Sequence, residues 1–232
     1  VNVRSATDEH DIVMISTAGF ASRFKCSAIR ASGRVSGGVY GIKVGDRKGS
    51  GGGLVAGMVA INDPETQILT LSKFGMGKRS TIGSGERTAL LDEDGNQRTT
   101  ESGDLRFTTD GYRQTRPGAK GVRTMKLDED FDDSIISVRK IPNPDDHIFL
   151  LTKKGMMIRT EVSQTKKTTG KATRGTRVME LRNKKKDGYD DEVIFSARLP
   201  AELIEDSQKD SEDGELVDNI ESANEEISTE EE

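Results

Sequence analysis

The residues of this chain that are best suited to chemistry are basic, and they recur at a fixed distance from glycine. In three places an apolar run ends in a Gly that is followed four residues later by an Arg: Gly19 and Arg23, Gly75 and Arg79, Gly155 and Arg159. Arg carries a permanent charge and a planar fork of N–H donors, which suits it to phosphates and carboxylates. A repeated basic position therefore predicts a surface that binds a polyanion.

The other candidates for chemistry lack the pattern that their chemistry requires. His10 and His147 stand beside carboxylates, but metal-ligand spacing is absent, and polar residues at the start of a strand explain both better. The acidic run at residues 128–133 lacks the Gly and Glu pattern of a calcium loop, so we interpret it as an exposed connection between strands. Cys26 is the only cysteine, which excludes a disulfide framework and a thiolate metal site. We expect no metal site in this chain.

The basic positions belong to a repeat of two elements. The first element is the apolar run with its Gly and Arg, and it begins at residues 12, 68 and 148. The second element is a further Gly that opens an alternating strand, at residues 38–44, 121–127 and 175–181. Self-similarity in a fixed order indicates a modular array, in which each unit buries its apolar face against its neighbours. We refer to the three units as repeats one, two and three.

Repeat two carries an insertion between its two elements. The first Gly and the second Gly are 19 residues apart in repeat one, 20 in repeat three and 46 in repeat two. The extra residues fall near residues 83–109, which are polar and rich in Gly. We expect a surface excursion with a small hairpin around Asp94 and Gly95.

Composition favours short strands over helices. Only 32% of the residues are hydrophobic, Trp is absent and 25 Gly punctuate the chain, so the core must be divided into small packets. Few segments carry a helical period longer than two turns. The folded part of the chain, residues 1–199, is therefore predicted to be all-β.

The net charge of −5 averages two unlike regions. Residues 200–232 contain fourteen Asp and Glu and one Lys, a charge of −13, and residues 1–199 contain 26 acids and 34 bases, a charge of +8. The acidic segment has almost no strand-forming run, and we expect it to be a disordered tail. A basic body with an acidic tail indicates a polyanion-binding module and a segment that can compete with the polyanion.

Two further expectations concern location and completeness. No apolar stretch approaches membrane-spanning length and no signal peptide is visible, so we expect a cytoplasmic protein in a reducing compartment. The chain opens without Met, at Val1, Asn2 and Val3, which read as the end of a strand whose partners lie upstream. We interpret the chain as a fragment.

Two motifs resemble a known family. Residues 71–79 read LSKFGMGKR and residues 33–44 read GRVSGGVYGIKV. Both resemble the C-terminal domain of the A subunit of bacterial-type DNA gyrase, which is also found in topoisomerase IV. The resemblance covers roughly residues 1–199 and implies a β-pinwheel, a closed, propeller-like ring of four-stranded blades that usually number six. Three repeats and a preceding strand then correspond to the last half of such a ring.

The family's hallmark heptad, Gln-Arg-Arg-Gly-Gly-Lys-Gly, is present only in degenerate form. Residues 115–121 read TRPGAKG and keep four of its seven identities. We interpret them as a degenerate copy on a later blade, with the true heptad upstream. The sequence therefore leaves open whether the parent protein is a gyrase or a topoisomerase IV.

The resemblance implies a function for the basic positions. Such a domain binds and bends duplex DNA without reading bases, within an ATP-dependent type II topoisomerase that introduces negative supercoils. Repeated Lys and Arg would neutralise phosphates, and Gly-rich turns would bring backbone N–H groups close to phosphate oxygens. The expected DNA-binding residues are Arg23, Arg34, Lys78, Arg79, Arg113, Arg116, Lys120, Arg123, Arg159, Lys171 and Arg174.

The resemblance places the catalytic parts outside this chain. The tyrosine that cleaves DNA lies in another domain of the family, and Tyr40, Tyr112 and Tyr189 lack its sequence context. Mg²⁺ would act with that tyrosine, and ATP would bind to the partner B subunit. Two A and two B subunits would assemble through the missing N-terminal regions, as an A2B2 heterotetramer associated with the chromosome. No catalytic residue and no cofactor are expected here.

Three alternatives remain open at this point. The parent could be a topoisomerase IV-type decatenase. A propeller adaptor that binds proteins would need a shared apolar patch, whereas the repeats carry basic positions. A hydrolase built on a propeller would need acids or nucleophiles that converge near the ring axis, and the sequence shows no such set.

Overall fold

Each of the three apolar runs forms the first strand of a tight hairpin. The hairpins are β1 (Asp11–Ser16) with β2 (Phe20–Lys25), β4 (Gln67–Ser72) with β5 (Met76–Thr81), and β10 (His147–Thr152) with β11 (Met157–Glu161). The turn Gly of each hairpin lies in the left-handed region, with φ of 78° at Gly19, 78° at Gly75 and 85° at Gly155. Only Gly adopts this conformation without steric cost, so the repeated Gly fixes the position of each turn.

A third strand covers the inner edge of every hairpin. It is β3 (Val55–Ile61) in repeat one, β9 (Ile135–Ile141) in repeat two and β15 (Val193–Leu199) in repeat three. Each pairs antiparallel with the first strand of its own hairpin, and the register shifts at the last residue of that strand in all three. The three repeats therefore share their topology down to the position of the irregularity.

The fourth strand of a blade comes from the following repeat. The sheet orders are β3-β1-β2-β8 and β12-β5-β4-β9, where β8 (Val122–Arg123) belongs to repeat two and β12 (Thr176–Arg177) to repeat three. The third sheet, β11-β10-β15, has three strands. The second elements of repeats two and three thus cross to the preceding repeat instead of completing their own blades.

The second elements are less regular than the alternating pattern predicts. β8 and β12 are two residues long, and residues 38–44 form no strand, with one isolated bridge between Ile42 and Ala119. Residues 121–127 divide their backbone hydrogen bonds between repeats one and three. Thr124 donates to Gly19 at 2.8 Å, whereas Lys126 donates to Thr173 at 3.1 Å. The prediction of continuous strands is wrong for this reason.

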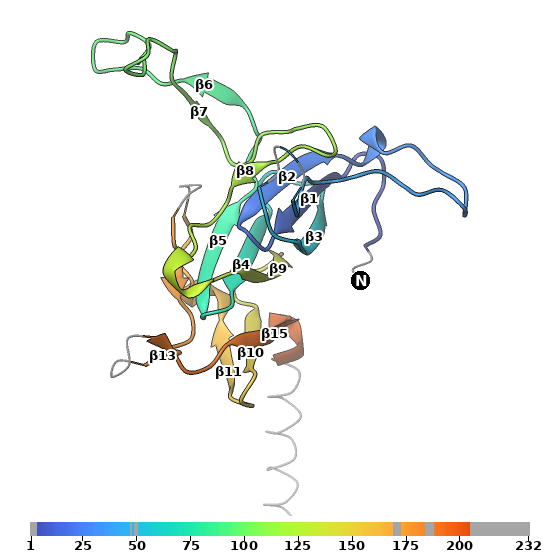
Figure 1. Ribbon diagram of the computed structural model, residues 1–232, viewed down its shortest axis with the longest axis vertical. Coiled ribbons are helices and arrows are strands. Elements are labelled where there is room, and N and C mark those ends of the chain that lie inside the picture. The colour runs from blue at the N-terminus through green and yellow to red at the C-terminus, as the bar shows by residue number, and fades with distance from the viewer. Residues whose placement is uncertain (1–3, 47, 49–50, 169–172, 184–187, 205–232) are drawn as a thin grey trace, which may run out of the picture.

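The core lies between repeats, as expected for an array. One packet joins Val13 and Ile15 of repeat one to Ile68, Ile82 and Met125 of repeat two. A second packet joins strands of repeats two and three, among them Leu69, Leu71, Ile148, Leu150 and Val193. Figure 1 shows the three sheets following one another along the long axis of the molecule, with β3 and β9 near its middle and β15 toward the lower end.

The insertion in repeat two forms an arm that projects from the sheets (Figure 1). Its base is the hairpin of β6 (Arg87–Ala89) and β7 (Phe107–Thr109). An antiparallel bridge between Leu91 and Gln97 encloses the turn at Gly95, so the predicted small hairpin is confirmed. The flanking strands remain intact, which shows that the array accepts the insertion without a change in topology.

The structure, a computed structural model, describes residues 4–46, 48, 51–168, 173–183 and 188–204. Short elements complete it: the strands β13 (Arg182–Asn183) and β14 (Gly188–Tyr189), and the 3-10 helices η1 (Cys26–Ala28), η2 (Glu129–Phe131) and η3 (Val162–Gln164). Within the described part, no helix has the length and apolar character to span a membrane. The all-β prediction is confirmed. The strand expected at residues 1–3 and most of the expected disordered tail lie outside the described residues.

The crossing strands predict unequal costs for two glycine substitutions. A Cβ on Gly75 would lie 2.4 Å from the carbonyl oxygen of Met179 in the next repeat, whereas a Cβ on Gly95 in the arm would meet nothing within 4 Å. Both have positive φ, so we expect Gly95→Ala to cost ~1–2 kcal/mol. Gly75→Ala should cost a further ~1–3 kcal/mol, because the segment of repeat three that contains Met179 must move away from the new methyl group.

Urea denaturation followed by circular dichroism measures this difference, with Gly95→Ala as the control for backbone strain alone. Equal losses for the two variants would contradict the tight crossing at Gly75.

Candidate nucleic-acid interface

Arg23, the first of the repeated arginines, is buried and joins two repeats. Its guanidinium donates to Asp11 at 2.8 Å through Nε, and to the carbonyl oxygens of Gly83 and Tyr112 at 2.7 and 2.9 Å through Nη1. Only 4% of Arg23 is exposed. Burial raises the pKa of Asp11, but the hydrogen bonds and charges of Arg23 and Lys25 outweigh it, so this pKa lies below its ordinary value. Asp11 therefore stays ionised and holds Arg23 inside.

Lys78 in β5 is also buried, with 1% exposed. Its ammonium donates to the carbonyl oxygen of Thr124, in the second element of its own repeat. Desolvation lowers the pKa of Lys78 to about 8. The prediction that Arg23 and Lys78 stand on the surface is wrong, because both side chains turn inward to backbone carbonyl groups that need donors.

The three arginines that follow the turn glycines occupy three different environments. Eight residues before each Gly stands Asp11, Gln67 or His147. In repeat two this position is occupied by Gln67, so the half-buried Arg79 has no carboxylate there. The Nε and Nη1 atoms of Arg79 and the Oε1 atom of Gln67 make no hydrogen bond within the described part of the chain. Arg159 is exposed and donates from Nε to His147 Nδ1 at 3.0 Å. Of the three, Arg159 is thus the most available to a ligand.

Three of the six exposed predicted residues lie on one segment, residues 113–123, which we call the basic segment. Arg113, Arg116 and Lys120 are exposed, and Arg123 is half-buried. The ammonium of Lys120 and the guanidinium of Arg123 lie 5.1 and 5.0 Å from the centre of the Phe20 ring, which holds both near one place.

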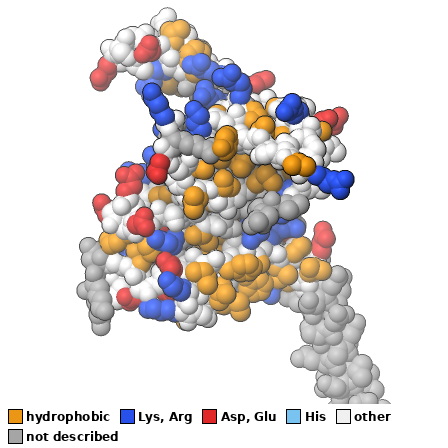
Figure 2. Space-filling view, turned by 45° about the vertical axis from the view of Figure 1, so that its right-hand side comes forward, with side chains coloured by type: hydrophobic (Ala, Val, Ile, Leu, Met, Phe, Trp, Pro, Cys, Tyr) orange, Lys and Arg blue, Asp and Glu red, His pale blue; other side chains and the backbone are white. Residues whose placement is uncertain are grey.

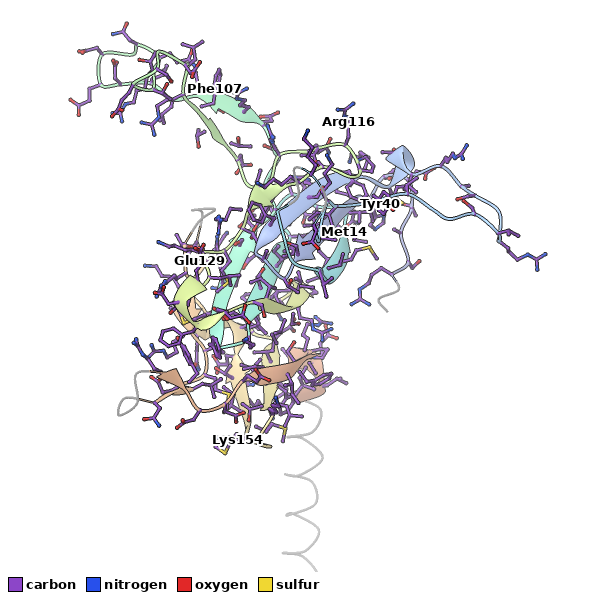
Figure 3. The ribbon with its side chains drawn as sticks, viewed as in Figure 1. Met14, Tyr40, Phe107, Arg116, Glu129 and Lys154 are labelled. Atoms are coloured by element: carbon purple, nitrogen blue, oxygen red, sulfur yellow. The ribbon has the colours of Figure 1, made fainter. Side chains whose placement is uncertain are left out.

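Backbone contacts fix the basic segment along the outer edge of β2. Thr115 donates to the carbonyl oxygen of Arg23 at 2.6 Å, and Gly118 donates to that of Gly41 at 3.0 Å. Figure 3 shows Arg116 pointing outward near Tyr40, beyond the edge of the sheet. In Figure 2 several Lys and Arg side chains gather at this end of the molecule, around the base of the arm. The fold thus presents several cations from one short segment.

The other predicted residues stand apart from the basic segment in the sequence. Arg34 is exposed in the loop after η1. Arg174 is exposed and lies 3.6 Å from Asp128, which neutralises part of its charge. Arg123 similarly lies 3.9 Å from Glu129. Lys171 lies outside the described residues.

Lys43 is a basic residue near the basic segment that the repeat of Gly and Arg does not single out. It is exposed and lines an open groove of about 770 Å³, together with Arg116 and the apolar side chains of Val39, Tyr40 and Pro117. Its place within the motif at residues 33–44 could have identified it. The arm is a poorer candidate, because residues 83–110 hold seven Asp and Glu and three Arg.

Metal-binding clusters and tyrosines are the other candidates for chemistry in the described residues. No group of three or more His, Cys, Asp or Glu within them could hold a metal ion. The Tyr112 hydroxyl is hydrogen-bonded to that of Thr124, and burial raises the pKa of Tyr112. Tyr189 stacks on Phe74 with ring centres 4.0 Å apart. Two of the three tyrosines thus contribute to packing. The groups that the candidate interface offers to a ligand are the cations of Lys and Arg.

Comparison with known proteins identifies relatives of this architecture. The family model described as the DNA gyrase C-terminal domain, beta-propeller, matches residues 10–50, 105–142 and 146–197, more than half of the chain. The A subunit of DNA gyrase from Campylobacter jejuni is 29% identical over 194 residues, which cover 84% of this chain and 18% of that protein. The chain therefore spans less than a fifth of the length of this relative.

Two solved structures share the fold. The C-terminal domain of DNA topoisomerase IV matches with a TM-score of 0.62 and 15% identity, over 87% of this chain and 50% of that chain. The E. coli ParC C-terminal domain matches with a TM-score of 0.54 and 15% identity, over 84% of this chain and 64% of that chain. The prediction of propeller-like blades is thereby confirmed.

The contrast between two equivalent arginines gives a prediction about stability. Arg23→Met leaves the buried Asp11 carboxylate without its main partner, and removing one partner of a buried ion pair costs about 3–5 kcal/mol. Arg159→Met, at the same repeat position, should cost below about 1 kcal/mol because its side chain is exposed.

Urea titrations of the two variants, followed by circular dichroism, give both values. A loss at Arg23→Met no larger than that at Arg159→Met would show that Arg23 does not join the repeats.

Proposed function

Because this chain belongs to the family of DNA gyrase C-terminal domains, we propose that it binds duplex DNA through phosphates and bends it. The observation that carries this proposal is the basic segment, in which Arg113, Arg116 and Lys120 stand exposed on one short stretch beside the outer strand β2. No acid occurs between residues 111 and 127. A polyanion approaching this edge meets cations without competing carboxylates from the same stretch.

The proposed mode of binding follows from the kind of contact that these residues can make. Lys and Arg bind phosphate oxygens and release counterions, which provides affinity without reading the base sequence. Positive-φ Gly residues at 118 and 121 keep the backbone of the basic segment free of side-chain bulk. Bending a site of 20–30 bp costs on the order of 1–6 kcal/mol, so several such contacts must act together.

The larger role is proposed at the level of the parent protein. The domain would present DNA to the catalytic part of a type II topoisomerase, an isomerase that acts with Mg²⁺ and contains two A-type and two B-type chains. ATP would be hydrolysed on the B-type chains. With a gyrase-like parent the enzyme would introduce negative supercoils, and with a topoisomerase IV-like parent it would separate linked duplexes. Such an enzyme would work in the cytoplasm on the chromosome.

Salt dependence of DNA binding tests the basic segment. For the pair of substitutions Arg116→Gln and Lys120→Gln, we expect the slope of log affinity against log salt to fall by about 1.8, since each phosphate contact contributes about 0.9. Fluorescence anisotropy with a short labelled duplex measures it, on the full chain.

The matched control is the pair Lys153→Gln and Lys154→Gln, two exposed cations in the turn of the third hairpin. Figure 3 places Lys154 at the opposite end of the molecule from Arg116. An unchanged slope in the first pair, or an equal change in the control pair, would rule out the basic segment as the interface.

The acidic tail gives a further prediction about affinity. Residues 200–232 carry fourteen Asp and Glu and one Lys, and we propose that they compete with DNA for the basic surface. Deleting these residues should strengthen DNA binding, most at low salt. A chain with a neutral Gly/Ser tail of equal length separates charge from bulk. Affinity that is unchanged at low salt would contradict the competition.

A further inference from the structure

The strands along the inner edges of the three hairpins are mostly apolar. β3, β9 and β15 together contain three charged residues, and all three are basic: Arg139, Lys140 and Arg198. These residues stand near the ends of their strands and line one cavity of about 540 Å³, which we call the inner groove. Arg4 also lines the inner groove. Four cations from three segments of the chain thus meet in one place.

One position of the repeat supplies most of these cations. Ala60, Lys140 and Arg198 each pair with the second residue of the first strand of their hairpin, which is an Ile in all three. Arg4 lies seven residues before the start of β1, as Ala60 and Lys140 lie seven residues before β4 and β10. All four residues line the inner groove. The groove therefore belongs to the repeat itself, because each repeat adds one such position to it.

The cations of the inner groove are only partly neutralised. Arg198 pairs with the buried Asp146 at 2.8 Å. Arg139 donates to the hydroxyl and carbonyl oxygens of Ser196, which leaves its charge in place. The half-buried Lys140 makes no ion pair within the described part of the chain. None of the described residues that line the groove is Asp or Glu, so the groove carries an excess of positive charge.

Arg4 and Arg139 lie close enough to repel each other. Burial, and after it the charge of Arg4, lowers the pKa of Arg139. Like charges in a half-buried place raise the free energy of the folded chain, and a bound anion opposes this effect. A cleft that gathers perturbed cations in this way is typical of a site for an anionic ligand.

From this arrangement we infer that the inner groove binds a small, multivalent phosphate anion. Arg presents a planar set of N–H donors and Lys a compact charge, and both bind phosphate oxygens. The cavity volume of about 540 Å³ lies within the range of pockets that hold small molecules, about 300–1,000 Å³. Val59 and Phe195 supply apolar walls, beside which charges attract each other more strongly than in open water. The basic segment does not line this groove.

Titration of the full chain with pyrophosphate tests the inference. Isothermal titration calorimetry at low salt should show one pyrophosphate bound per chain. Lys140→Gln should weaken binding about tenfold, because it removes a charge-assisted hydrogen bond. Ala60→Lys should strengthen binding, because it places a cation at the one of the four equivalent positions that lacks a charge. A gain in affinity cannot arise from a damaged fold.

The matched control is Lys154→Gln, which removes the same charge from the exposed turn of the third hairpin and should leave pyrophosphate binding unchanged. Absence of binding, or a loss with Lys154→Gln as large as that with Lys140→Gln, would overturn the inference. A loss that requires Arg116→Gln and Lys120→Gln instead would place the anion on the basic segment, with the same consequence.

The chain with the neutral Gly/Ser tail distinguishes free phosphate from the carboxylates of the acidic tail. We expect it to bind pyrophosphate at least as tightly as the unsubstituted chain does, since both contain the inner groove. Binding that appears only with the neutral tail would mean that the chain's own carboxylates occupy the groove, and would overturn the inference for a free phosphate.

Urea denaturation without an anion separates a binding role of Lys140 from a structural one. Because Lys140 stands among like charges, Lys140→Gln should be as stable as the unsubstituted chain or more stable. Pyrophosphate should then stabilise the unsubstituted chain more than it stabilises the variant. A clear loss of stability in Lys140→Gln without an anion would assign this residue to the structure and overturn the inference. Because no DNA is present, these results do not depend on the proposed function.

Discussion

The constraint on which the structure depends is that the outer strands of the first two hairpins each pair with a backbone from the next repeat. An outer strand presents a row of N–H and C=O groups, and such groups are costly when they are buried without partners. Residues of the crossing segments meet this need at Gly19 and Gly75, where Thr124 and Val178 donate to the carbonyl oxygens at 2.8 Å. The shared cores, the tight glycine contacts and the inward turn of Lys78 follow from this one arrangement.

The same arrangement decides which charges face solvent. Arg23 lies where repeat two crosses repeat one, so its guanidinium is used by the carbonyl groups of Gly83 and Tyr112 and by Asp11. The basic segment runs along the outside of this crossing, and its Arg116 side chain points away from the sheet (Figure 3). The cations therefore divide into a set that joins repeats and a set that is available to a polyanion.

The sequence predicts the local elements well and their partners poorly. The hairpins, the turn glycines, the insertion and the all-β class follow from spacing and from the left-handed turns, which are local properties. A second element could pair with its own repeat or with the neighbouring repeat. The alternation of residues along a strand is the same in both cases, so the sequence does not distinguish them. The burial of Arg23 was also missed, although Asp11 stands where the other repeats have Gln67 and His147. A carboxylate at that one position was the available signal for a buried pair.

The crossing topology also gives the array a direction. Repeat three covers β5 of repeat two, and repeat two covers β2 of repeat one, but repeat one covers no hairpin within the described residues. Local opening of repeat three therefore uncovers β5 of its neighbour, whereas opening of the β1–β2 hairpin leaves β5 covered by β12. Amide hydrogens should then report a polarised unfolding, in which disorder spreads from the C-terminal repeat toward the N-terminal one and not in reverse.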